Sequence, residues 1–179
     1  MVDYMAFQQG SYLLAAAGDM TDASTYAALA ASTKAAIVAA YFDPSTGTFG
    51  SRVQTNAMAI YSGIATDPGT VEGIFQQILN QPPVYPVSPY FNYFVISAMN
   101  KAGHYGDALR LMKAFWGSML STGATTFWEM YDPQCANRTD FHSCLTAYAN
   151  NFESDGEILY VSLSHGWSSG PAAFLSGID

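Results

Sequence analysis

The sequence predicts an all-α fold in which successive helices pair as αα-hairpins. Apolar residues recur at the three- and four-residue spacing of amphipathic helices along almost the whole chain, as in Val71, Ile74, Phe75, Ile78 and Leu79. Sustained alternation of apolar and polar residues, which is typical of strands, is hard to find. The connections between the expected helices are mostly short, and short connections make neighbouring helices run antiparallel.

Six or seven helices are expected, and most are bounded by residues that commonly begin or end a helix. Gly18 and Asp19 precede the second helix, and Asp67, Pro68 and Gly69 begin the fourth. The second helix is rich in alanine, which has the highest helix propensity and lets helices approach closely. The expected helices cover residues 4–17, 21–41, 51–65, 69–80, 89–102, 105–121 and 159–175.

One segment departs from the helical pattern. Residues 132–158 contain Pro, Cys, Asn and Asp with little periodicity, so we expect a long inserted loop there. Cys135 and Cys144 are the two cysteines of the chain, and their closeness in the sequence predicts a small disulfide that ties the loop. Asn137 begins an Asn-Arg-Thr glycosylation sequon between them. Together these features predict an extracellular, secreted protein.

Composition limits the classes of function. A chain of 179 residues is long enough for a single domain with a real core. The formal net charge is −8, so the chain offers no basic patch for nucleic acid or for an anionic membrane. Only 11% of the residues are charged, compared with about 25% in ordinary soluble proteins. Either other polypeptide covers part of the surface, or the surface is rich in uncharged polar residues, as in secreted proteins.

The stretch from Gly123 to Asp132 contains the best candidate for chemistry. It follows a helix and precedes the long loop, and loops on rigid helical scaffolds often carry reactive groups. Glu129 follows Trp128, and a carboxylate can activate water at an anomeric carbon while an aromatic face packs on the C–H surface of a sugar. On chemistry alone, a solvated Glu129 and a Trp128 that fills the core are the commoner outcome.

A second candidate stretch runs from Ser162 to Pro171 and includes His165, Gly166 and Trp167. A histidine beside a glycine can approach a ligand without crowding, and its ring offers a donor or an acceptor to a hydroxyl group. The alternative is a buried histidine that bonds to backbone groups. The three histidines and two cysteines are too scattered to predict a zinc site, and we expect neither a metal nor a cofactor.

Two motifs in this order resemble those of a known family. Gly-Ala-Thr-Thr-Phe-Trp-Glu at 123–129, followed by Ser-Leu-Ser-His-Gly-Trp at 162–167, resembles the α-L-rhamnosidases and their relatives among the six-hairpin glycosidases. The resemblance implies part of an (α/α)6 toroid and cleavage of a terminal rhamnosyl or related sugar with inversion. It implies that Glu129 is the general base that deprotonates the attacking water, and that His165, Trp128 and Trp167 bind the sugar.

The chain departs from the family pattern in two ways. The family's general acid lies upstream in an Asp-rich motif with Arg and Glu, and nothing in this sequence matches it. We therefore expect residues 1–179 to be one partial catalytic domain, about the C-terminal half of the toroid. An N-terminal half or a partner chain would complete it. The long loop at 132–158 is the second departure, since it enlarges the region between the two motifs.

Two other interpretations compete with a glycosidase. The chain can be a half-toroid that binds carbohydrate or another protein without catalysis, or a helical scaffold whose aromatic residues all belong to the core. The position of Glu129, Trp128 and His165 discriminates between these interpretations. Convergence on one surface favours the glycosidase, and dispersal favours the scaffold.

Overall fold

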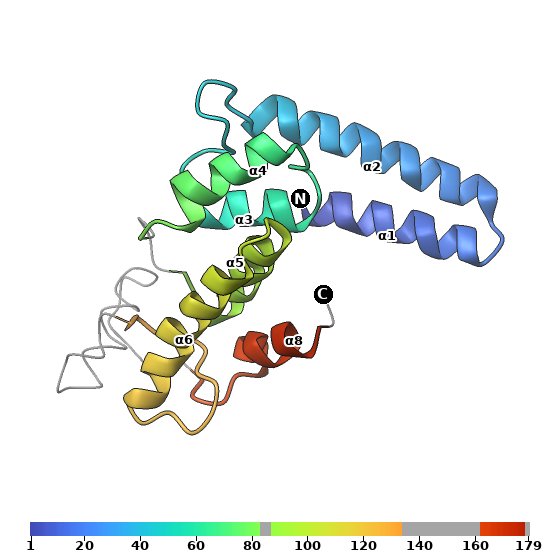
Figure 1. Ribbon diagram of the computed structural model, residues 1–179. Coiled ribbons are helices and arrows are strands. Elements are labelled where there is room, and N and C mark those ends of the chain that lie inside the picture. The colour runs from blue at the N-terminus through green and yellow to red at the C-terminus, as the bar shows by residue number, and fades with distance from the viewer. Residues whose placement is uncertain (83–86, 134–161, 178–179) are drawn as a thin grey trace, which may run out of the picture. The chain divides into compact units, whose positions relative to one another are not determined.

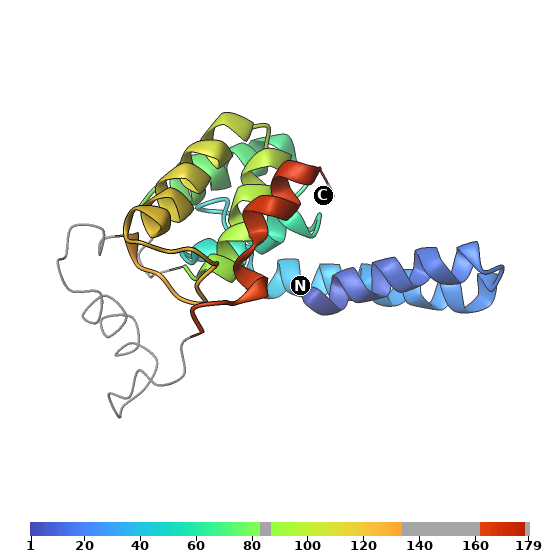
Figure 2. The ribbon, with the colours of Figure 1, turned by 90° about the horizontal axis from the view of Figure 1, so that it is seen from below.

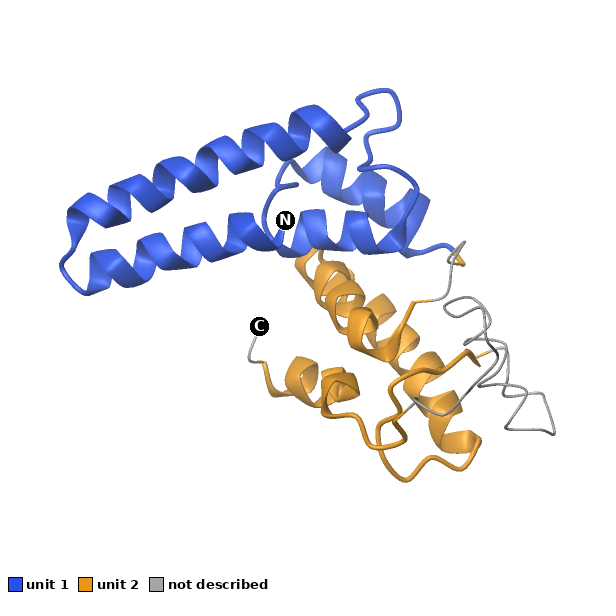
Figure 3. Ribbon diagram, turned by 180° about the vertical axis from the view of Figure 1, so that it is seen from behind, with its two compact units in different colours: residues 1–81 blue, residues 82–179 orange. Residues whose placement is uncertain are grey.

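The computed structural model describes residues 1–82, 87–133 and 162–177. Over these residues the chain forms helices and a single isolated bridge between Asp43 and Thr48, with no strand, which confirms the all-α fold class. The chain divides into two compact units, Met1–Gln81 and Pro82–Asp179, which are coloured separately in Figure 3.

The first unit begins with a long helical hairpin. Helix α1 (Val2–Ala16) and helix α2 (Met20–Tyr41) lie side by side, as Figures 1 and 2 both show. Gly18 makes the turn with a φ of 87°, a conformation that side chains disfavour. Asp19 then caps α2, because its carboxylate accepts a hydrogen bond from the backbone N–H of Asp22 at 3.0 Å.

In the rest of the first unit, a buried asparagine holds the loop that leads into the next helix. Asn56 is fully buried in α3 (Val53–Tyr61), where its amide accepts from the Phe49 N–H at 2.9 Å and donates to the Gly50 carbonyl at 2.8 Å. These bonds fix the loop that precedes α3. Helix α4 (Pro68–Ile74) follows and continues into a π-helix, η1 (Phe75–Leu79).

The second unit contains the α5–α6 hairpin and the C-terminal elements. Helix α5 (Pro89–Lys101) and helix α6 (Tyr105–Ser121) pack together, and α5 also contacts the 3₁₀ turn η3 (Gly166–Ser168) and helix α8 (Gly170–Ser176). Pro89 occupies the first turn of α5, where its missing N–H costs nothing. The α5–η3 contact brings residues of the second motif next to the start of α5, where the ring of Tyr90 meets that of Trp167.

Most expected helices are confirmed with shifted ends, and one is wrong over much of its length. The helix expected at 159–175 is a loop and a 3₁₀ turn from 162 to 169, and helix α8 covers only Gly170–Ser176. Pro171 explains the late start, because it lacks an N–H and is accepted only in the first turn of a helix. The helix expected at 51–65 ends at Tyr61, just before Gly63 with a φ of 78°.

The expected loop at 132–158 lies almost wholly outside the described residues. Cys135, Cys144 and Asn137 belong to that part of the chain, so the disulfide and the glycosylation site stay predictions. Of the helices that the structure describes, none combines the length and the hydrophobicity that crossing a bilayer would need.

Candidate functional site

The two sequence motifs lie against each other in the second unit. The backbone N–H of Glu129 donates to the Ser162 carbonyl at 2.9 Å, and the backbone N–H of His165 donates to the Phe127 carbonyl at 2.7 Å. The Thr126 hydroxyl also donates to the carbonyl of Leu163. The two segments therefore run antiparallel, held by backbone bonds, although the backbone forms no regular strand there.

The side chain of Glu129 takes part in this pairing. Its Oε2 atom accepts a hydrogen bond from the Ser162 N–H at 2.9 Å, so the carboxylate takes the place that a backbone carbonyl would have in a regular ladder. The same atom lies 4.0 Å from Nδ1 of His165. The side chains of Glu129 and His165 are 36% and 29% exposed, so both reach the solvent from fixed positions.

Trp167 extends this surface beyond the histidine. Its ring meets that of His165 nearly edge-on, with centroids 5.6 Å apart and an interplanar angle of 74°. Trp167 is 72% exposed, whereas the other two tryptophans, Trp116 and Trp128, are 5% and 6% exposed. The structure thus brings Glu129, His165 and Trp167 together on one accessible surface of the second unit.

Trp128 is placed differently from the other predicted site residues. Its ring is buried and packs edge-on against Tyr131 at 5.9 Å, and Tyr131 in turn packs against Phe115 on α6 at 5.7 Å. The burial agrees with the alternative in which Trp128 fills the core. Sugar contact by Trp128 stays a prediction based on the motif.

A buried hydrogen bond anchors the second motif to α6. The indole N–H of Trp116 donates to the Ser168 carbonyl at 3.0 Å, and both residues are buried. Directly afterwards, Gly170 lies against α5 so closely that a Cβ at this position would be 2.7 Å from the Cβ of Tyr93. These two contacts hold the segment that contains His165 and Trp167.

Sequence reasoning passed over one further pattern. Residues 166–170 read Gly-Trp-Ser-Ser-Gly, which matches the G-x-S-x-G signature of serine hydrolases. That signature needs an exposed serine on a sharp turn between a strand and a helix. Ser168 is 0% exposed and lies in a 3₁₀ turn, and the segment before it is not a strand, so the match has no catalytic setting.

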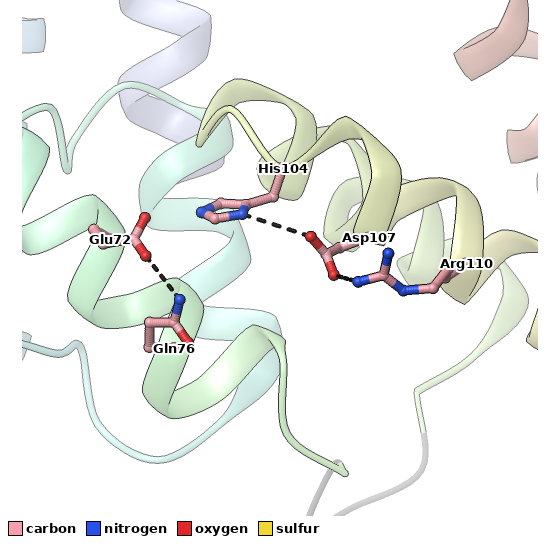
Figure 4. Close-up of polar contacts among 5 residues, drawn as sticks. All are labelled: Glu72, Gln76, His104, Asp107 and Arg110. Carbon is pink, nitrogen blue, oxygen red and sulfur yellow. Dashed lines mark hydrogen bonds and ion pairs between the residues drawn. The ribbon is translucent and has the colours of Figure 1, made fainter.

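The second histidine of the described residues belongs to a separate polar cluster. At the start of α6, Nδ1 of His104 lies 3.6 Å from Oδ2 of Asp107, and Oδ1 of Asp107 accepts a hydrogen bond from Arg110 (Figure 4). Figure 4 also shows the Glu72–Gln76 pair, in which the side-chain amide of Gln76 in η1 donates to the carboxylate of Glu72 in α4 at 2.8 Å. Within the described ranges, no group of three or more His, Cys, Asp or Glu side chains could hold a metal.

The first unit has a hollow of its own. A cavity of about 300 Å³ lies between α1 and α2, and its lining includes Tyr4, Gln8, Tyr12 and Lys34. Three of these polar side chains have partners, since Gln8 donates to the Tyr4 hydroxyl at 3.2 Å and Lys34 donates to the Gly63 carbonyl at 2.9 Å. None of the residues predicted for the site lines this cavity.

Comparisons with known proteins point to the family that the motifs resemble. Residues 4–154 match the bacterial α-L-rhamnosidase six-hairpin glycosidase domain. Among solved structures, the chain is similar to a GH78 family rhamnosidase of Bacillus sp. GL1, with 25% identity and a TM-score of 0.72. The alignment covers 98% of this chain but only 18% of that protein, so the chain spans less than a fifth of its length. No curated protein matches the chain.

Proposed function

The chain belongs to the family of bacterial α-L-rhamnosidase six-hairpin glycosidase domains, and from this premise we propose that it contributes to an inverting glycosidase. The proposed substrate is a glycoside with a terminal rhamnosyl or related sugar. The observation that supports the proposal most is the meeting of Glu129 with His165 at 4.0 Å, since these residues come from separate motifs.

In this proposal Glu129 acts as the general base. An inverting glycosidase needs a carboxylate that removes a proton from the water that attacks the anomeric carbon. Oε2 of Glu129 is held by the Ser162 N–H, whereas Oε1 accepts no hydrogen bond from any residue that the structure describes. Oε1 is therefore available to accept the proton of a bound water, while the bond to Oε2 fixes the orientation of the carboxylate.

The neighbouring rings provide the sugar contacts. His165 offers a ring nitrogen to a sugar hydroxyl, and Trp167 offers an exposed aromatic face to the C–H surface of a pyranose. Trp128 supports the site from behind by packing on Tyr131. The motif resemblance also makes Trp128 a sugar contact, but its burial favours the supporting role.

We propose that further polypeptide completes the domain. Helices with apolar side chains on all sides are normally buried, yet α1 and α2 expose many large apolar residues. These are Val2, Tyr12, Leu13, Met20, Tyr26, Leu29 and Tyr41, each at least 38% exposed. The chain also lacks a match to the family's general acid. Helices from upstream in the polypeptide, or from a partner chain, would cover the apolar surface and supply that acid.

The test is turnover of an aryl α-L-rhamnoside, followed by NMR of the anomeric proton of the sugar first released. The chain extended upstream through the missing helices should release β-L-rhamnose, because inversion converts an α-glycoside into the β-anomer. The chain of 179 residues should be slower by roughly 10²–10⁴, because it lacks the general acid. Absence of turnover in the extended protein, or first release of the α-anomer, would refute the proposal.

A second candidate function is supported by the same exposed apolar surface. The chain could serve as a non-catalytic half-toroid that binds carbohydrate or another protein. Size-exclusion chromatography with light scattering shows whether the chain forms a dimer. The activity of the extended protein shows whether it is a catalyst. A stable dimer of the chain that binds rhamnose, combined with an inactive extended protein, would favour the binding module.

We also propose that the protein is extracellular. The support comes from Cys135, Cys144 and the sequon at Asn137, all outside the described residues. A disulfide lowers the mass of the intact protein by two hydrogens, so mass measurement with and without reduction tests the pairing. Two free thiols in the protein purified from a secreting host would count against the extracellular location.

A further inference from the structure

Tyr90 and Trp167 form an exposed aromatic pair in the second unit. Tyr90 lies in the first turn of α5 and is 43% exposed, and its ring centroid is 5.5 Å from that of Trp167, at an interplanar angle of 42°. The two residues are far apart in the sequence, and the contact between α5 and η3 brings them together. Neither motif in the sequence pointed to Tyr90 as a site residue.

The pair is held from both sides by contacts that fix its geometry. Tyr90 packs edge-on against Phe94, one turn later on α5, with centroids 5.4 Å apart. The segment with Trp167 is anchored by the bond from Trp116 to the Ser168 carbonyl. Two exposed rings in fixed positions lose little conformational entropy when a ligand binds, which distinguishes them from freely rotating surface aromatics.

The pair continues the candidate site. Oε2 of Glu129 lies 4.0 Å from Nδ1 of His165. The ring centroid of Trp167 lies 5.6 Å from that of His165 and 5.5 Å from that of Tyr90. These side chains therefore form a continuous row of contacts from the Glu129 carboxylate to the rings of Trp167 and Tyr90. Few polar groups beside an apolar, aromatic surface are the usual composition of a small-molecule site.

We propose that Tyr90 and Trp167 form a platform that binds a pyranose ring of the substrate, with Tyr90 as a binding residue. The ring would place its C–H face on the two side chains while its hydroxyl groups reach His165. The inference rests on the proposed function, because it takes the ligand of the Glu129–His165 surface to be a glycoside.

Tryptophan fluorescence gives a direct test, because Trp167 is exposed and the other two tryptophans are buried. Acrylamide quenching of the chain should therefore report mainly on Trp167, and L-rhamnose should protect it. Saturation-transfer NMR on L-rhamnose measures the affinity independently. Tyr90→Ala should weaken binding by roughly three- to tenfold, the range expected for loss of one aromatic contact, and Tyr90→Phe should retain it.

Tyr41→Ala is the matched control, because Tyr41 is an exposed tyrosine at 62% at the end of α2 in the first unit. It should leave rhamnose binding unchanged, and circular dichroism should show that all three variants stay folded. Binding that is unaffected by Tyr90→Ala, or a wild-type protein whose Trp167 is not protected by rhamnose, would overturn the platform.

These outcomes are separate from those of the proposed function. Turnover by the extended protein together with unchanged sugar binding in Tyr90→Ala would reject the platform alone. Sugar binding that depends on Tyr90, in an extended protein without rhamnosidase activity, would support the platform and reject the catalytic proposal alone.

Discussion

Glu129 and Ser162 bind each other twice, although 33 positions separate them. The Glu129 N–H donates to the Ser162 carbonyl at 2.9 Å, and the Ser162 N–H donates to Oε2 of the Glu129 carboxylate at 2.9 Å. The backbone of Glu129 thus joins the two motifs, and the Ser162 N–H sets the direction of the Glu129 carboxylate. The carboxylate of the proposed base is therefore oriented by a hydrogen bond from the backbone of the second motif.

The close packing of Gly170 against α5 predicts a destabilising substitution. In Gly170→Ala the new Cβ would lie 2.7 Å from the Cβ of Tyr93, so α8 must move away from α5. We expect the free energy of unfolding to fall by about 1–3 kcal/mol in urea unfolding. Gly117→Ala is the control, since Gly117 is within α6 and, apart from the adjacent backbone of the helix, nothing lies within 4 Å of a Cβ there. It should stabilise by about 0.5–1 kcal/mol, and equal losses in both variants would contradict the packing argument.

The indole of Trp116 should contribute to stability through its hydrogen bond. Trp116→Phe keeps an aromatic ring but leaves the buried Ser168 carbonyl without its donor at 3.0 Å. An unsatisfied buried acceptor costs about 1–3 kcal/mol of unfolding free energy. Trp167→Phe changes an exposed ring and should leave the stability nearly unchanged. Comparable unfolding midpoints for the two variants would show that the bond is unimportant.

Helix α4 should show a pH-dependent contribution from its cap. The backbone N–H and the hydroxyl of Thr70 both donate to the Asp67 carboxylate. These bonds, the backbone one most strongly, lower the pKa of Asp67 from its ordinary value of 3.8. The group binds protons more weakly in the folded state, so its stabilisation is fully present above pH 3.8 and is lost as pH falls through the folded pKa.

Thermal unfolding of Asp67→Asn tests this cap. Asparagine is also a good N-cap but does not titrate, so the variant should lose less stability than the wild type as pH falls below 3.8. Asp67→Ala should lower the melting temperature at neutral pH because the cap is removed. Parallel pH profiles for the wild type and Asp67→Asn would exclude Asp67 as the titrating group.

Local signals in the sequence were sufficient for most helices. Ser88 and Pro89 begin α5 where expected, and α6 covers the predicted residues 105–121. Both helices depend on capping and on apolar spacing, which are local properties. The π-helix at 75–79 was missed, because its apolar residues also fit an ordinary α-helix.

The candidate site depended on contacts that local patterns do not contain. The motif resemblance identified Glu129 and His165, but their distance of 4.0 Å depends on pairing between segments far apart in the chain. Tyr90 was not predicted as a site residue, because its proposed role depends on the packing of α5 against η3. The sequence left open whether Trp128 fills the core or contacts a sugar, and its packing against Tyr131, which lies on Phe115 of α6, shows that it is buried.

Glu129→Gln in the extended protein tests the central claim most directly. Glutamine can keep the bond from the Ser162 N–H to its side-chain oxygen, so the fold and the sugar affinity should be retained. The amide is not a base, so hydrolysis of an aryl α-L-rhamnoside should fall by roughly 10²–10⁴ in kcat with little change in KM. A kcat that stays within a few-fold of the wild type would show that Glu129 is not the general base and that the proposed site is wrong.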